Sequence, residues 1–120
     1  MRFFCYTMGD ESAPISPPTP EMMAEMGQWV DEAMKAGWLI ETGGFAPTSQ
    51  AVKVRLDNGK FTTTDGPFAE AKELIGGWAL VDFPTRDEAI EMMKKFLTIT
   101  GGGESVLRQV FGPRDDFDEA

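Results

Sequence analysis

The sequence predicts an α+β domain in which an antiparallel sheet carries two helices on one face. Two stretches place apolar residues at the spacing of an amphipathic helix, and each stretch begins with a capping residue. Six shorter segments are rich in β-branched and aromatic residues and are bounded by turn-forming residues. Along the chain these elements follow as strand, helix, four strands, helix and strand.

The first strand is expected over residues 2–8, and a proline-containing loop follows it. The first helix begins after Thr19, because Thr19 can cap it, Pro20 fits the first helical position and Glu21 complements the helix dipole. Gly37 is expected to end the helix in a left-handed conformation. The predicted apolar stripe of this helix is Met22, Met26, Trp29, Val30, Ala33 and Met34.

Four strands are expected between the two helices. They cover residues 38–42, 51–56, 60–64 and 74–83. The second and third of these strands are joined through Asn58-Gly59, which predicts a tight hairpin because both residues tolerate positive φ angles.

The second helix is expected to begin with a capping box formed by Thr85 and Glu88, which are three residues apart. A glycine-rich loop separates this helix from the last strand, residues 105–111, and residues 113–120 form an acidic tail that is expected to be loose. The predicted apolar stripe of the second helix is Ala89 or Ile90, Met93, Phe96 and Leu97.

This order of elements is typical of the ferredoxin-like group, with one domain spanning residues 1–120. The face of the sheet away from the helices should then be polar, but apolar residues occupy both faces of the predicted strands. A large exposed apolar face marks an interface, so we expect a homodimer in which two sheets pack face to face. The strand residues concerned are Phe3, Phe4, Cys5, Tyr6, Met8, Trp78, Ala79, Leu80, Val81 and Phe83.

The chain is acidic, with a net charge of −9 from 20 acidic and 11 basic residues. Nucleic acid and anionic membrane surfaces are therefore not expected as partners, because both attract basic faces. The single cysteine, Cys5, permits no internal disulfide and agrees with a reducing compartment. No signal-like or membrane-spanning apolar run is present, so we expect a cytoplasmic protein.

The segment Asp65-Gly66-Pro67-Phe68 is the leading candidate site. It sets a carboxylate, a flexible hinge, a rigid ring and an aromatic side chain next to one another, as the edge of a pocket would. In a semi-apolar cleft Asp65 could act as a general acid or base. The alternative is local turn chemistry, in which the Asp65 carboxylate accepts backbone N–H groups. The two roles are compatible.

Arg108 lies between Val106 and Val110 on one face of the last strand, so we expect it at an inward position. It is the candidate anion clamp, since its guanidinium can bind a carboxylate or phosphate through two parallel hydrogen bonds. The alternative is a salt bridge to Asp82, to Glu70 or to the dimer mate. Tyr6 is a further candidate at the border of the ligand cleft. No metal or cofactor is expected, because the chain lacks histidine and has one cysteine.

Several residues together resemble the DGPF subgroup of the YCII-related family over most of the chain. They are Gly43, Asp65-Gly66-Pro67-Phe68, Glu70, Lys72-Glu73, Gly76-Gly77-Trp78 and Arg108. The resemblance implies a dimeric α+β barrel, and members often accompany extracytoplasmic-function sigma factors. Some wider relatives are enzymes that pair a histidine with an aspartate. Such a pair is excluded here, because the chain contains no histidine.

Three functions therefore stay open. The first is a small-molecule-binding or accessory protein whose cleft lies near Asp65 and Phe68, bordered by Arg108 and Tyr6. The second is an enzyme that uses Asp65 as acid or base on a small organic acid held by Arg108. The third is an interaction module that serves a transcriptional regulator.

Overall fold

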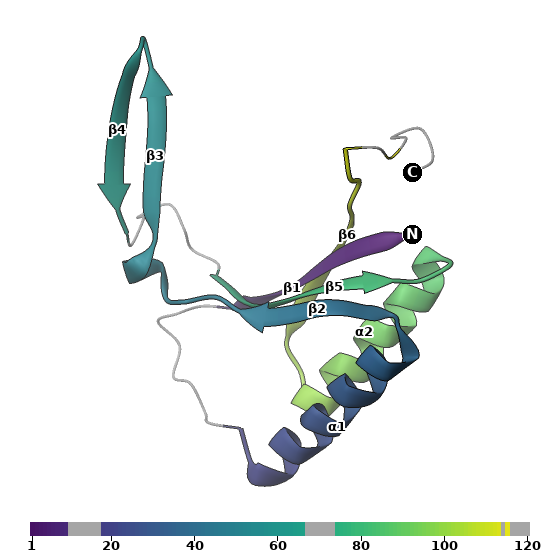
Figure 1. Ribbon diagram of the computed structural model, residues 1–120. Coiled ribbons are helices and arrows are strands. Elements are labelled where there is room, and N and C mark those ends of the chain that lie inside the picture. The colour runs from purple at the N-terminus through teal and green to yellow at the C-terminus, as the bar shows by residue number, and fades with distance from the viewer. Residues whose placement is uncertain (10–17, 67–73, 114, 116–120) are drawn as a thin grey trace.

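The computed structural model describes residues 1–9, 18–66, 74–113 and 115. Its main sheet has four strands in the order β2-β5-β1-β6, and each neighbouring pair is antiparallel. Both helices lie on one face of this sheet (Figure 1). This arrangement confirms the predicted α+β, ferredoxin-like fold. The bounds are β1 Arg2–Gly9, α1 Pro20–Ala36, β2 Leu39–Gly44, β5 Leu74–Asp82, α2 Arg86–Thr100 and β6 Glu104–Gln109.

The core lies between the sheet and the helices. In β1, Phe3 stands opposite Val81 of β5 and Gln109 of β6, and Cys5 stands opposite Ala79 and Leu107. Phe3 and Cys5 are buried because β1 runs between two other strands and the helices cover its inner face. The buried apolar residues are Phe3, Cys5, Ala33, Leu39, Val81, Ala89 and Met92.

Helix α1 has the ends that the sequence predicts. The Thr19 hydroxyl oxygen accepts a hydrogen bond from the Met22 N–H at 3.1 Å. Gly37 adopts a φ of 87° and donates its N–H to the Ala33 and Met34 carbonyls, both at 3.1 Å. The predicted stripe is too wide at its end, since the Met34 side chain is 44% exposed while Ala33 is buried.

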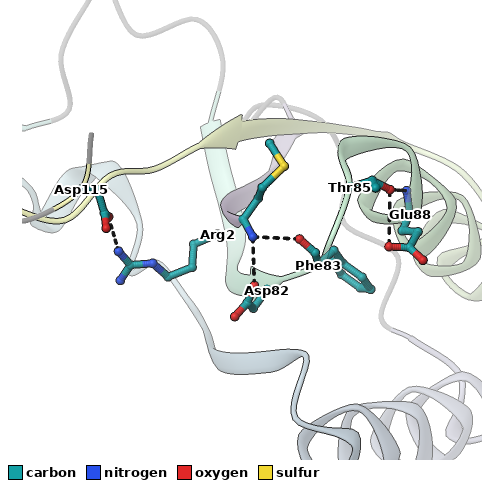
Figure 2. A network of polar contacts seen from close by, with 7 residues as sticks. Arg2, Asp82, Phe83, Thr85, Glu88 and Asp115 are labelled. Carbon is teal, nitrogen blue, oxygen red and sulfur yellow. Dashed lines mark hydrogen bonds and ion pairs between the residues drawn. The ribbon is translucent and has the colours of Figure 1, made fainter. Parts of the chain in front are cut away.

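The capping box of α2 is also present. The Glu88 N–H donates to the Thr85 hydroxyl oxygen at 3.2 Å, and the hydroxyl donates to the Glu88 carboxylate at 3.4 Å (Figure 2). The buried residues of the helix are Ala89 and Met92. The predicted stripe contained Met93 but not Met92. Because Ala89 and Met92 are three residues apart, the buried face is displaced by about one position from the predicted face.

A separate two-stranded sheet is formed by β3, Val52–Asp57, and β4, Lys60–Asp65. A short 3₁₀ helix, Thr48–Gln50, precedes it. The turn is the predicted one, with φ angles of 50° at Asn58 and 77° at Gly59. This β3–β4 hairpin projects from the side of the main sheet that faces away from the helices (Figure 1).

Polar contacts hold residues near both ends of the described chain. The Met1 ammonium donates to the Phe83 carbonyl at 2.9 Å and lies 3.3 Å from the Asp82 carboxylate (Figure 2). Arg2 forms an ion pair with Asp115, whose carboxylate also accepts the Gly112 N–H. The Gly112 bond and the nearby Arg2 charge lower the pKa of Asp115. The predicted tail is therefore attached at Asp115, while residues 114 and 116–120 lie outside the described residues.

Candidate functional site

The Asp65-Gly66 pair lies at the base of the β3–β4 hairpin. Asp65 is the last residue of β4, stands opposite Val52 and has an exposed side chain. The Gly66 N–H donates to the Ala51 carbonyl at 2.7 Å. Pro67 and Phe68, and also Glu70 and Lys72, lie outside the described residues. The acid–base role of Asp65 and the cleft beside Phe68 therefore stay predictions.

Tyr6 and Arg108 lie in the main sheet and share its outer face, the face that points away from the helices. Arg108 stands opposite Phe4, and Tyr6 stands opposite Val106 two pairs further along. Arg108 has an exposed side chain, so the inward position expected for it is not observed. Its expected partner Asp82 instead pairs with the Met1 ammonium. Asp65 belongs to the other sheet, so the three described site candidates are divided between two sheets in a single copy.

A cavity of about 210 Å³ lies between the main sheet and the two helices. Apolar side chains from both helices form one wall, and strand residues from the inner face of the sheet form the other. The helix residues are Met26, Trp29, Val30, Met92, Met93 and Phe96. The strand residues include Cys5, Thr7, Thr42, Ala79 and Ser105. The lining carries no acidic or basic side chain among the residues described, so the cavity fits an uncharged, mainly apolar molecule.

Three small hydroxyl side chains line this cavity, and each is bonded to a strand backbone. The predicted site residue Tyr6 is also a lining residue, as are Trp29, Trp38 and Trp78. Thr42 donates to the Trp78 carbonyl at 2.9 Å, and Ser105 donates to the Tyr6 carbonyl at 3.1 Å. The Thr7 hydroxyl oxygen accepts the Gly77 N–H at 2.7 Å. The hydroxyl oxygens of Thr42 and Ser105 keep acceptor capacity, so the cavity can receive one or two donated hydrogen bonds.

The Thr7 contact has a structural cause in the strand register. Tyr6 pairs with Trp78, but Met8 pairs with Ile75, so β5 holds one extra residue at Gly76-Gly77. Such a bulge removes an N–H group from the ladder, and the Thr7 hydroxyl satisfies that N–H. The bulge thus accounts for the hydrogen bond of the Thr7 hydroxyl, which lines the cavity.

Cys5 lines the cavity as an unreactive group. Its side chain is buried, and burial raises the pKa of the thiol from 9.0 to about 11. Because the thiolate is the nucleophilic form, this cysteine stays a neutral thiol at neutral pH. The cavity wall therefore supports binding by shape and dispersion rather than covalent chemistry.

Aromatic rings connect this cavity with the outside of the helix pair. The ring centroid of Trp29 lies 5.4 Å from that of Trp38 and 6.2 Å from that of Phe96. Trp38 lies 5.1 Å from Phe83. An open groove of about 730 Å³ follows the two helices past Trp29, Trp38 and Phe83. Its rim carries charges of both signs, namely Glu25, Glu32, Glu88, Glu91, Lys94 and Lys95.

The outer face of the main sheet carries a row of aromatic rings. Phe4 lies between Trp78 and Tyr6, at centroid distances of 6.0 and 5.9 Å, and the Phe4 and Trp78 planes differ by 15°. The Trp78 ring covers the backbone of Gly43, since a Cβ atom there would lie 2.9 Å from the Trp78 Cζ2 atom. All three aromatic residues are only half-buried, and neither of the described helices α1 and α2 covers this face (Figure 1).

Sequence reasoning did not identify the inner cavity. The feature of the sequence that could have predicted it is the occurrence of three small hydroxyl residues at inward strand positions. Such residues are also common on exposed strand faces. Only the pairing register of β1, β5 and β6 shows that Thr7 and Ser105 come to the same side. Neither helix in the described part of the chain is long and apolar enough to cross a membrane.

Two comparisons with known proteins gave matches. The sequence profile of the family described as YCII-related domain matches residues 1–108. An uncharacterized protein of Rhizobium meliloti (strain 1021) is 36% identical over 61 residues, which are 51% of this chain and 49% of that protein. The match thus spans about half the length of this relative.

Proposed function

Because the chain belongs to the YCII-related domain family, we propose that it is a small-molecule-binding protein whose ligand occupies the cavity between the main sheet and the helices. The observation that carries this proposal is an apolar cavity of about 210 Å³ with hydroxyl groups in its wall. Its volume is below the ~300–1,000 Å³ typical of sites for drug-sized ligands. The ligand is therefore a compact, uncharged molecule with few polar groups.

Phenol and benzoate separate this proposal from the anion-clamp hypothesis. They share an aromatic ring, but only benzoate is anionic at neutral pH. Phenol should shift the amide NMR signals of Cys5, Thr42 and Ala79 in a saturable manner, because they line the cavity. Benzoate should not, because a charge entering this wall would lose its hydration. Preferential binding of benzoate near Arg108 would contradict the proposal.

A pair of substitutions tests the location of binding. Ala79→Leu adds volume inside the cavity and should weaken phenol binding at least about tenfold, a loss of ~1.4 kcal/mol. Ala24→Leu makes the same change at an exposed position of α1 and should leave binding unchanged. Equal binding by the two variants would show that phenol binds elsewhere. Thermal unfolding of both variants checks that each is folded.

We also propose that the chain is a member of the DGPF subgroup and forms a homodimer through the outer face of the main sheet. The Asp65-Gly66-Pro67-Phe68 sequence supports the subgroup. The half-exposed row of Phe4, Tyr6 and Trp78 supports the dimer, because a wet apolar face of this kind is unfavourable in a monomer. The dimer would also bring the exposed Arg108 side chains of two copies to one interface.

Sedimentation equilibrium tests the dimer. Leu80→Lys introduces a charge on the outer face and should weaken self-association strongly, since an unpaired charge would be desolvated there. Ala24→Lys introduces the same charge on the exposed side of α1 and should have little effect. A wild-type protein that stays monomeric at micromolar concentrations would refute the dimer without affecting the cavity proposal.

A further inference from the structure

The β3–β4 hairpin exposes all of its strand residues. None of the residues 52–57 or 60–65 is even half-buried. Large apolar side chains are among the most exposed in the described chain, with Phe61 at 72%, Val54 at 63%, Leu56 at 62% and Val52 at 57%. A two-stranded hairpin is at best marginally stable alone in water, so this one requires a surface to pack on.

The pairing register sorts these side chains onto one face. Val52 pairs with Asp65, Val54 with Thr63, and Leu56 with Phe61. Because paired residues share a face and successive residues alternate, the four large apolar side chains line one face together. The opposite face carries Lys53, Arg55, Asp57, Lys60, Thr62 and Thr64. The hairpin is thus an amphipathic ribbon with one apolar and one mainly basic face.

The direction of the hairpin indicates what covers it. It projects from the side of the main sheet that faces away from the helices, which is the side of the uncovered aromatic row (Figure 1). A second copy stacked on that row would lie beside the hairpin. The hairpin is also held at its base, where the Gly66 N–H donates to the Ala51 carbonyl and the Ala51 N–H donates to the Thr48 carbonyl. These two bonds close the base of the hairpin.

The charges of the hairpin also favour a second copy of this chain as its partner. Three of the chain's 11 basic residues, Lys53, Arg55 and Lys60, lie within this hairpin, although the chain as a whole has a net charge of −9. A second copy therefore presents an acidic body to a locally basic arm. In a two-fold symmetric dimer each copy supplies one arm and receives one, so the apolar area covered is doubled.

We propose that the β3–β4 hairpin is an arm that embraces a second copy of this chain and buries Val52, Val54, Leu56 and Phe61 against it. The inference rests on the self-association proposed above and adds a specific contact to it. Asp65 lies at the base of this apolar face, opposite Val52.

Chemical cross-linking in a mixture of isotope-labelled and unlabelled protein tests whether the arm contacts a second copy. Equal amounts of isotope-labelled and unlabelled full-length protein are mixed, and a zero-length carbodiimide joins lysine amines to carboxylates. Cross-linked peptides that join Lys53 or Lys60 of one isotope to an acidic residue of the other show that the arm reaches a second copy. Arm cross-links that join only peptides of the same isotope would overturn the inference, because the arm would then lie on its own body.

A triple substitution tests the apolar face. Val54→Thr, Leu56→Thr and Phe61→Thr together keep a high strand preference but remove the large apolar groups, and the dimer dissociation constant should rise at least about tenfold. Thr62→Val with Thr64→Val is the control, because both residues lie on the opposite face. This control should stay within about threefold of wild type.

The outcomes separate the two proposals. A stable dimer whose dissociation constant is unchanged in the triple variant would overturn the arm and leave the sheet-to-sheet dimer standing. A wild-type chain that is monomeric at all concentrations would overturn both. Amide hydrogen exchange checks the hairpin: residues 52–65 should be protected in concentrated wild-type protein, and the protection should be lost on dilution to the monomer.

Discussion

A Cβ atom added to Gly66 would lie 2.0 Å from the carbonyl oxygen of Thr48 and 3.2 Å from that of Ala51. The chain that leaves the β3–β4 hairpin therefore crosses the chain that enters it at a distance that only glycine permits. This contact explains the glycine of the Asp65-Gly66 pair by packing. The pair closes the base of the hairpin, whatever chemistry Asp65 performs.

Gly66→Ala should destabilise the protein by roughly 1–3 kcal/mol, because the obstructing atoms belong to the backbone and must move together. Gly9→Ala is the matched control, since no atom lies within 4 Å of the added Cβ and the residue has no positive φ. Urea unfolding measures both free energies. Equal free energies of unfolding for Gly66→Ala and Gly9→Ala would contradict this prediction. Amide NMR should show the changes of Gly66→Ala concentrated in residues 48–66.

Gly43→Ala should displace the Trp78 ring, because the new Cβ would lie 2.9 Å from the Trp78 Cζ2 atom. A side chain can rotate away, so the expected cost is about 1 kcal/mol. The indole N–H signal of Trp78 in NMR reports the movement, and its stacking on Phe4 should be weakened. Gly44→Ala meets only the Gly76 carbonyl oxygen at 3.5 Å and should leave that signal in place.

Cys5 should make stability fall between pH 9 and pH 11. Burial raises the pKa of the folded thiol from 9.0 to about 11. In this interval the unfolded chain loses the thiol proton while the folded chain keeps it, so the contribution is complete below pH 9 and lost as the pH passes about 11. Relative to Cys5→Ala, which lacks the group, wild type should lose about 2–3 kcal/mol. A constant difference between the two proteins across this range would contradict the prediction.

Gly27→Ala should stabilise the protein by about 0.5–1 kcal/mol. Gly27 lies inside α1 with no atom within 4 Å of an added Cβ, and alanine restricts the unfolded chain. Gly37→Ala makes the same chemical change at the left-handed cap, where φ is 87°, and should destabilise by about 1 kcal/mol. The midpoint temperature of thermal unfolding should therefore rise for Gly27→Ala and fall for Gly37→Ala.

Local signals allowed most elements to be predicted from the sequence. Thr19, Thr85 and Gly37 define helix ends through contacts within a few residues, and Asn58-Gly59 defines a turn through its own φ angles. The structure places all four as expected. The order of elements was sufficient for the ferredoxin-like arrangement because short antiparallel topologies of this composition are few.

The site depended on contacts between distant residues, which local signals do not contain. Arg108 follows an apolar alternation that predicts an inward position, but β6 pairs with β1 so that Arg108 lies beside Phe4 on the outer face. The separate hairpin was predicted as two strands, yet the sequence did not show that these strands leave the main sheet. The Thr7 hydroxyl is bonded to the Gly77 N–H, which a bulge about 70 residues further along the chain, at Gly76-Gly77, removes from the strand ladder.

The central position of β1 has a consequence for biosynthesis. This strand is translated well before its two neighbours, β5 and β6. Phe3 and Cys5 thus cannot acquire their native strand partners until β5 and β6 have also been synthesised. Folding of the sheet must therefore wait for these later strands, and the aromatic β1 segment stays unpaired with them in the meantime.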